Sequence, residues 1–151
     1  MRLLKQFEEY ISLGIVKKVS PDMERAKSLV KESERKMISM KQKEEKLGIT
    51  LLNANDYVEY CYDLLMHIVR AHMYLEGYSS SGQGAHEAEV SYLRILDFSD
   101  KDVQFADQMR YFRNGILYYG TVLDVVYAEK VIAFTKKVYP KLSSLIQKRI
   151  L

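Results

Sequence analysis

The segment MRYFRNGILYYG, residues 109–120, gathers polar side chains of kinds that can bind and act on phosphate. Arginine suits phosphate because its guanidinium stays charged and offers a planar fork of donors. Asparagine adds a neutral donor and acceptor, and tyrosine adds a ring on which a base can stack. We therefore predict phosphate binding by Arg110 and Arg113, and a catalytic or binding set of Arg113, Asn114, Tyr118 and Tyr119. A second interpretation is equally open from spacing alone: the two arginines pair with acids such as Asp107.

Helical spacing predicts how this segment is positioned. Apolar residues recur at steps of three and four, a period that favours one buried helix face. The stripe consists of Phe105, Met109, Phe112, Ile116, Tyr119 and Leu123. A second line steps by four through Arg110, Asn114 and Tyr118 and falls beside that stripe. We predict a helix over residues 105–119 with its apolar stripe buried and this second line outside the core.

The composition favours one soluble, all-α domain. The chain has 151 residues, 48% hydrophobic and 28% charged, with only 2 Pro and 7 Gly. No stretch alternates apolar and polar residues over the length of a strand, so we predict an up-and-down bundle of five or six helices. The amino-terminal stretch contains Glu8 and Glu9 and has no long apolar run, which argues against a signal peptide or a membrane span.

Metal and cofactor chemistry are not expected. The single Cys61 cannot form an intramolecular disulfide, and the three histidines, at positions 67, 72 and 86, lack the spacing of a zinc site. We expect no metal and no cofactor, and a reducing cytoplasm as the compartment. His72 lies on an apolar stripe and is expected to be a core residue, whereas Asp63, His67 and Arg70 are expected to form a local charge pair.

Capping residues predict where the helices begin and end. The expected caps and stops are Ser20, Gly48, Asn53 or Asn55, Gly77, Ser99, Gly120, and Thr121 or Asp124. Residues 77–84, GYSSSGQG, are predicted to be a flexible loop. Pro140 is expected to kink or end the last helix.

Charge is unevenly distributed although the net charge is only +3. Residues 17–46 carry ten Lys and Arg against six Asp and Glu, and residues 124–151 carry six against two, so each segment is +4. The middle, residues 47–123, carries five against ten. Basic segments attract polyanions such as RNA, but solvated helix faces show the same composition, and both interpretations are open.

The order of three motifs resembles the HEPN domain, especially its small stand-alone members. The motifs are AKSLVKESERKM, then YVEYCYDLLMHIVRAHMYLEGYSSSGQGAHEAEVSYL, then MRYFRNGILYYG. The resemblance covers about residues 20–138 of a single domain, leaving 1–19 as an N-terminal helical extension and 139–151 as a C-terminal basic tail helix. It implies a helical bundle that forms a homodimer, often paired with a minimal nucleotidyltransferase as toxin and antitoxin.

Active members of this family resemble metal-independent endoribonucleases with an arginine and a histidine separated by four to six residues. Arg113 matches that arginine and Asn114 the polar residue that often follows it, but Tyr118 or Tyr119 stands at the histidine position. With a reference pKa of about 10, tyrosine transfers protons near neutral pH far less readily than histidine, at about 6.5. His86 is a possible accessory proton carrier from another helix.

Three functions are therefore open. The first is a dimeric RNA- or nucleotide-binding module with a degenerate ribonuclease motif. The second is an active endoribonuclease toxin, and the third is a non-catalytic partner of a nucleotidyltransferase. The missing motif histidine favours the first and the third.

Overall fold

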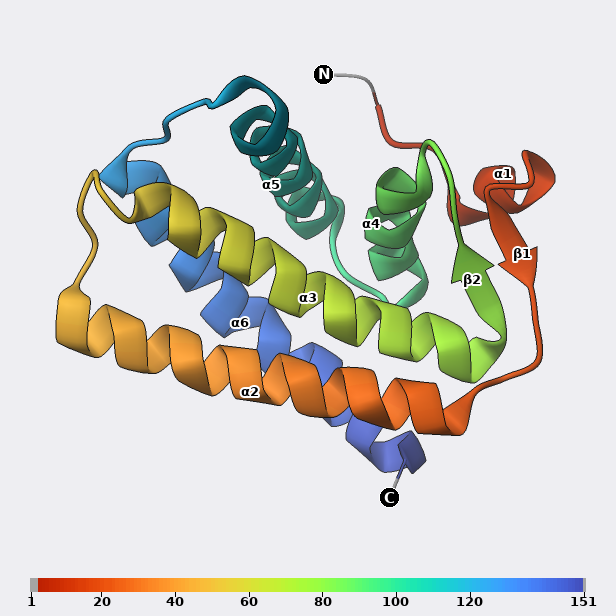
Figure 1. The fold of residues 1–151 in the computed structure, drawn as a ribbon. Coiled ribbons are helices and arrows are strands. Elements are labelled where there is room, and N and C mark those ends of the chain that lie inside the picture. Colours follow the sequence, from red (N-terminus) through yellow and green to blue (C-terminus); the bar gives the residue numbers. More distant parts are fainter. Residues whose placement is uncertain (1–2, 151) are drawn as a thin grey trace.

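A computed structural model describes residues 3–150, which fold into an all-α bundle with one small sheet (Figure 1). Residues 1–2 and 151, the ends of the predicted extension and tail, lie outside the described part. The prediction of an all-α helical bundle is confirmed. Its helices are α1 (Phe7–Ser12), α2 (Met23–Leu47), α3 (Ala54–Glu76), α4 (Ala85–Ile95), α5 (Asp100–Tyr119) and α6 (Val125–Ile150).

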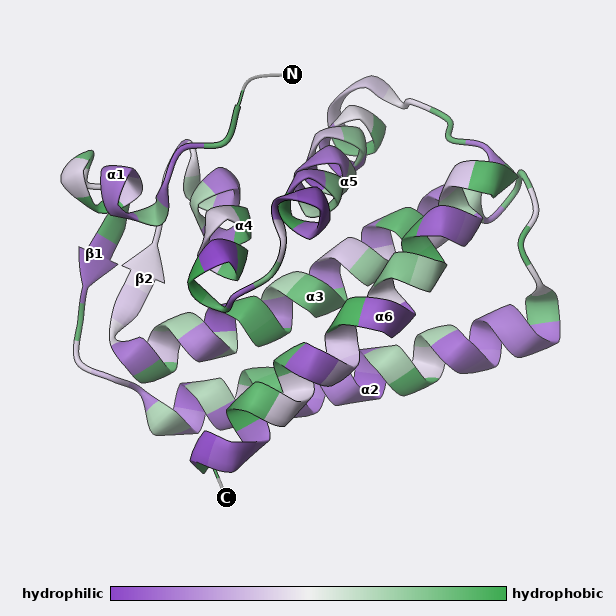
Figure 2. Cartoon of the chain, turned by 180° about the vertical axis from the view of Figure 1, so that it is seen from behind, coloured by the Kyte–Doolittle hydropathy of each residue, from purple (hydrophilic) through white to green (hydrophobic). Residues whose placement is uncertain are grey.

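Helix α3 is the centre of the bundle. It packs against α2 and α6 on one side and against α4 and α5 on the other (Figure 1). A helix covered on several sides must be apolar nearly all round, and α3 buries fourteen of its 23 residues. Helix α2, which is covered on one side only, is predominantly hydrophilic (Figure 2).

Two short strands lie outside the helical prediction. β1 (Val16–Lys18) pairs antiparallel with β2 (Tyr78–Ser80), with Lys17 opposite Ser79. The predicted loop over residues 77–84 therefore begins with a strand, and the predicted helical extension contains α1 followed by β1. Three residues are too few to show alternation, and each strand is stabilised by a partner that is distant in sequence.

Gly77 makes the turn from α3 into β2. Its φ of +80° is in the left-handed region, and a Cβ at this position would lie 2.5 Å from the carbonyl oxygen of Val19. Only glycine fits such a close backbone approach without displacement. The predicted helix end at Gly77 is thus confirmed, and the same residue allows β1 and β2 to meet.

Most predicted helix boundaries are confirmed, but the cap of α2 is displaced, and Asn53 stands at the start of α3 without a capping hydrogen bond from its side chain. The Ser99 hydroxyl accepts a hydrogen bond from the Asp102 backbone N–H at 3.2 Å, and the Asp124 carboxylate accepts one from the Tyr127 N–H at 2.7 Å. At the start of α2 the cap is Asp22, which accepts from the Arg25 N–H at 3.0 Å, and not Ser20. A carboxylate at this position also interacts favourably with the positive end of the helix dipole.

Helix α6 does not end at Pro140 but continues to Ile150. The turns beyond the proline bury Leu142 and Ile146 completely, so packing outweighs the hydrogen bond that proline removes. His72 of α3 is buried, as predicted, and its Nε2 donates to the carbonyl oxygen of Leu142 at 3.0 Å. Across residues 3–150, no helix combines the length and the apolar character needed to cross a membrane.

Candidate functional site

The buried face of α5 is narrower than its apolar stripe predicts. Met109 is fully buried, but Phe105, Phe112 and Ile116 are only half-buried. Tyr119, which continues the stripe, is 86% exposed, so its expected place in the core is wrong. The fully buried positions of the helix are Val103, Ala106, Asp107 and Met109. The last turn of α5 therefore projects beyond the surface that the neighbouring helices offer.

Arg110 is held by carboxylates. Its Nε donates to Asp107 Oδ1 at 2.7 Å, and a terminal nitrogen lies 3.7 Å from Glu87 Oε1 of α4. Burial alone would lower the Arg110 pKa, but the hydrogen bond to Asp107 and the charges of both acids outweigh burial and raise it. The side chain is 12% exposed, so Arg110 lies off the apolar core, as predicted, but is largely covered by its acidic partners. For Arg110, the second interpretation of the sequence, pairing with an acid such as Asp107, is therefore correct.

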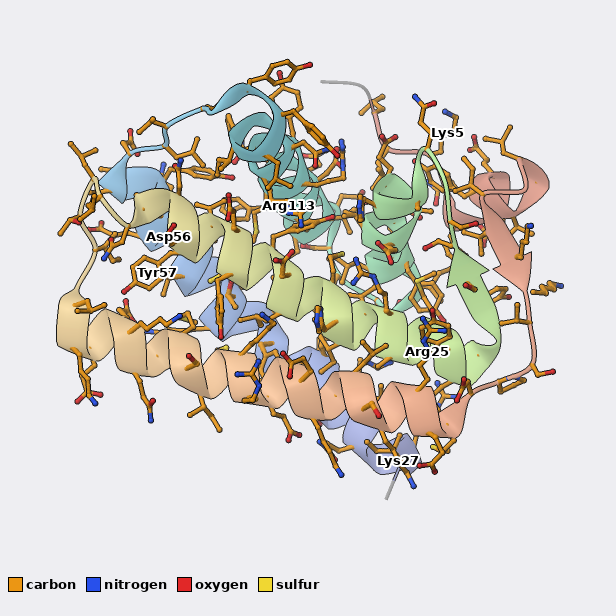
Figure 3. The ribbon with its side chains drawn as sticks, in the orientation of Figure 1. Lys5, Arg25, Lys27, Asp56, Tyr57 and Arg113 are labelled. Carbon is orange, nitrogen blue, oxygen red and sulfur yellow. The ribbon has the colours of Figure 1, made fainter. Side chains whose placement is uncertain are left out.

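Arg113 is held more loosely, between α5 and α3 (Figure 3). One terminal nitrogen donates to Asp63 Oδ1 of α3 at 3.2 Å, and the guanidinium carbon lies 5.5 Å from the centre of the Tyr62 ring. Its Nε is buried and, within residues 3–150, has no hydrogen-bond acceptor. Buried donors normally have acceptors, so this atom marks a position where an acceptor is expected.

Tyr62 supplies a second such donor directly beneath Arg113. Its side chain is 1% exposed, and its hydroxyl has no hydrogen-bond partner in the described chain. Burial, reinforced by the charge of Glu89, raises the pKa of the hydroxyl far above its usual range, against the opposing effect of the arginines. The hydroxyl is therefore protonated at neutral pH and can donate.

Glu89 of α4 organises the neighbouring part of this polar cluster. Its carboxylate is nearly fully buried, accepts two hydrogen bonds from the Arg70 fork and lies 3.1 Å from His86 Nδ1. Burial raises the pKa of Glu89, but the hydrogen bonds from His86 and Arg70 outweigh burial and lower it. His86 thus contacts Glu89 of its own helix rather than the arginines of α5.

The predicted local charge pair on α3 is wrong. Asp63 binds Arg113 of α5, and Arg70 binds Glu89 of α4. His67, one turn beyond Asp63, is half-buried, and burial followed by the charge of Arg70 lowers its pKa. Sequence spacing offered no signal for these partners, because they lie on different helices.

The structure does not bring the two motif tyrosines to Arg113 within one chain. Tyr118 is 75% exposed, which confirms its predicted place off the core, and no hydrogen bond or cation–π interaction joins either tyrosine to Arg113 in the described range. Asn114 is half-buried. The tyrosines belong instead to an exposed group at the end of α5 and the start of α6, here called the aromatic patch: Tyr111, Leu117, Tyr118, Tyr119, Val122 and Val126.

Gly115 lies where α5 meets the connection to α6. A Cβ on it would lie 3.0 Å from the Thr121 side-chain oxygen, and the Thr121 N–H donates to the Gly115 carbonyl at 3.2 Å. The glycine therefore allows the chain after Gly120 to fold back over the last turn of α5. Asn55 of α3 fixes the same connection, donating to the Thr121 carbonyl and accepting from the Leu123 N–H, both at 2.8 Å.

No group of three or more His, Cys, Asp or Glu side chains in residues 3–150 is arranged to hold a metal ion. Comparisons of this chain with protein-family models, with curated proteins and with solved structures found no match.

Proposed function

We propose that this protein is a HEPN-like, dimeric RNA- or nucleotide-binding module of the toxin-antitoxin type, with a degenerate ribonuclease motif centred on Arg113. The observation that carries the proposal is the pair of buried donors, Arg113 Nε and Tyr62 Oη, that have no acceptor in residues 3–150. Phosphate oxygens accept hydrogen bonds from donors of both kinds. Arg113 is also the residue that the resemblance identifies as the motif arginine.

The pairing of Arg113 with Asp63 is compatible with phosphate binding. Both side chains retain access to solvent, at 20% and 36% exposure, and an ion pair of this kind contributes only about 0 to 1 kcal/mol. Exchanging the carboxylate for a phosphate therefore costs little. Arg110 is more firmly held, by Asp107 and Glu87, so in this proposal Arg113 is the arginine that is available to exchange its acid for a phosphate.

The tertiary arrangement of charge gives separate support. Helices α2 and α6 belong to the two basic segments, and they lie side by side with links between Lys136 and Glu44 and between Gln147 and Glu34. Two segments of +4 each thus combine into one side of net +8. Such a surface attracts a polyanion and raises its rate of association. It also provides a competing location for RNA, away from Arg113.

Binding of a labelled single-stranded RNA, measured by fluorescence anisotropy over a range of salt concentrations, tests the proposal. We expect affinity to fall steeply with salt and Arg113→Gln to weaken binding at least tenfold. Arg149→Gln is the matched control, because Arg149 is also a partly exposed arginine paired with one acid, Glu76, but lies on α6. Loss of binding in Arg149→Gln but not in Arg113→Gln would place RNA on the basic side and contradict the proposed site.

Cleavage of labelled total RNA distinguishes the enzymatic alternative. We expect little cleavage by the wild type, and a gain from Tyr118→His or Tyr119→His, since general acid-base catalysis is typically worth about 10² to 10⁴ in rate. That gain requires a second protomer, because neither tyrosine contacts Arg113 within one chain. Rapid metal-independent cleavage by the wild type that Arg113→Gln abolishes would establish an active endoribonuclease instead.

The aromatic patch favours an interaction role alongside binding. Neighbouring exposed apolar side chains are typical of surfaces that associate with another protein. In this proposal the first occupant is a second copy, and the alternative occupant is a nucleotidyltransferase. Cys61 is a free, buried thiol, which is compatible with a protein that functions in the reducing cytoplasm.

A further inference from the structure

The short sheet closes a polar pocket that the function above does not use. It lies at the end of α3, about three helical turns beyond Asp63, where β2 and the start of α2 meet. Its volume is about 250 Å³, and its lining is mainly polar. The lining residues that matter here are Arg25, Arg70, Tyr74, Tyr78, Ser79 and Ser80.

Arg25 gives the pocket an uncompensated positive charge. Its guanidinium carbon lies 4.4 Å from the centre of the Tyr74 ring, and no carboxylate of the described chain lies within ion-pair distance of it. Stacking on a ring restrains the guanidinium while leaving its donor edge free for a ligand. Figure 3 shows Arg25 directed toward the end of α3, whereas Lys27 projects from the outer side of α2.

The edge of β2 adds backbone donors. The Ser81 N–H donates to the Ile15 carbonyl, and the Val19 N–H donates to the Gly77 carbonyl. Ser79 lies midway between Gly77 and Ser81, so it also forms a hydrogen-bonded pair with its β1 partner, Lys17. Antiparallel pairs alternate, and the N–H groups of Tyr78 and Ser80 therefore face away from β1. Ser79 and Ser80 both line the pocket, and the two outward-facing N–H groups of β2 add donors at its border.

The acid in the pocket wall does not reverse this charge. Glu89 is neutralised by Arg70, which binds it through both oxygens, and it is also bonded to His86. The formal charges of Arg25, Arg70 and Glu89 sum to +1. A pocket of this sign that is rich in hydrogen-bond donors fits a tetrahedral oxyanion.

We infer that this pocket binds a phosphate monoester group, held by the stacked Arg25 fork and the donors of β2. The group can come from a small phosphorylated metabolite or from the 5′ end of an RNA. Both sources present the same dianionic phosphate. The pocket shares Arg70 and Glu89 with the polar cluster described above, but its lining does not include Arg113, so the two sites can be tested separately.

Amide NMR of the full chain, titrated with inorganic phosphate at constant ionic strength, tests the inference. We expect the signals of Tyr78, Ser79 and Ser80 and of the Arg25 side-chain N–H to move together. Arg25→Gln should weaken binding at least tenfold, and Arg25→Lys should weaken it less because charge is retained but the fork is lost. Lys27→Gln, which removes the same charge two residues along α2, should bind phosphate like the wild type.

Three controls keep the outcomes distinct. Arg25 is exposed, so an unchanged amide spectrum outside the pocket confirms that Arg25→Gln is folded. If a 5′-phosphorylated trinucleotide binds at least tenfold more tightly than its 5′-hydroxyl counterpart, the phosphate comes from an RNA end. If inorganic phosphate binds tightly but the two trinucleotides bind equally, the phosphate comes from a small metabolite. Equal affinity in wild type and Arg25→Gln overturns the inference. Shifts confined to residues 105–119 would also overturn it, while supporting the Arg113 site.

Discussion

Arg110 and Arg113 are one helical turn apart and yet differ in their freedom to meet a ligand. Arg110 is fixed by Asp107, a neighbour on its own helix, and by Glu87 of α4. Arg113 has one partly exposed acid, an aromatic ring and a buried N–H without an acceptor. The difference arises from the helix that each side chain faces. We therefore centre the proposed site on Arg113 and do not assign Arg110 an equal part in it.

At the same scale, His72 predicts how stability depends on pH. Burial lowers the His72 pKa, and the Leu142 carbonyl only partly offsets this effect. The unfolded chain therefore binds a proton more readily than the folded one, and the free energy of unfolding falls as pH drops below about 6.5. The slope for one such group is at most about 1.4 kcal/mol per pH unit.

Urea denaturation between pH 5 and pH 7 measures that slope, and His72→Gln should flatten it. The half-buried His67, whose pKa is lowered in the same direction, is the comparison: His67→Gln should flatten the slope less. The lowered pKa of Glu89 acts at more acidic pH and does not interfere in this window. An unchanged slope in His72→Gln would show that His72 is not buried in its neutral form.

Helix α5 carries residues that stabilise the fold and residues that are candidates for binding. Met109 is fully buried, so Met109→Ala should lower the free energy of unfolding by about 2 to 5 kcal/mol. Phe112 packs edge-on against Tyr127 but is half-buried, so Phe112→Ala should cost about 1 to 2 kcal/mol. Arg113→Ala should cost no more than about 1 kcal/mol. Urea denaturation of the three variants tests this order, and a loss in Arg113→Ala equal to that in Met109→Ala would make Arg113 structural.

At the scale of the whole molecule, the aromatic patch predicts self-association. We expect a homodimer at micromolar concentration, in which the patch faces its own copy across a two-fold axis. Val122→Glu introduces a charge into the patch and should give a monomer, as measured by light scattering. Ile38→Glu changes an equally apolar and exposed residue on α2, away from the patch, and should leave the dimer intact. A monomeric wild type would contradict the homodimer and favour a different protein as the occupant.

Features that depend on local physics are predictable from the order of the amino acids. Ser99, Gly77 and Gly120 were predicted to bound helices because capping hydrogen bonds and left-handed turns involve only residues within about one turn. The helical period likewise predicted the all-α bundle and the burial of Met109. These features need no knowledge of which helices become neighbours.

Features that depend on distant partners become known only when the helices are packed together. Pairing of β1 with β2, binding of Arg113 to Asp63 and binding of Arg70 to Glu89 all join segments far apart in the chain. Tyr119 is another example. The helical period of the sequence predicts that it is buried, but the end of α5 extends beyond the neighbouring helices, and the side chain is exposed. A helical period gives the direction of a side chain, whereas the packing of helices around α3 decides what that side chain meets.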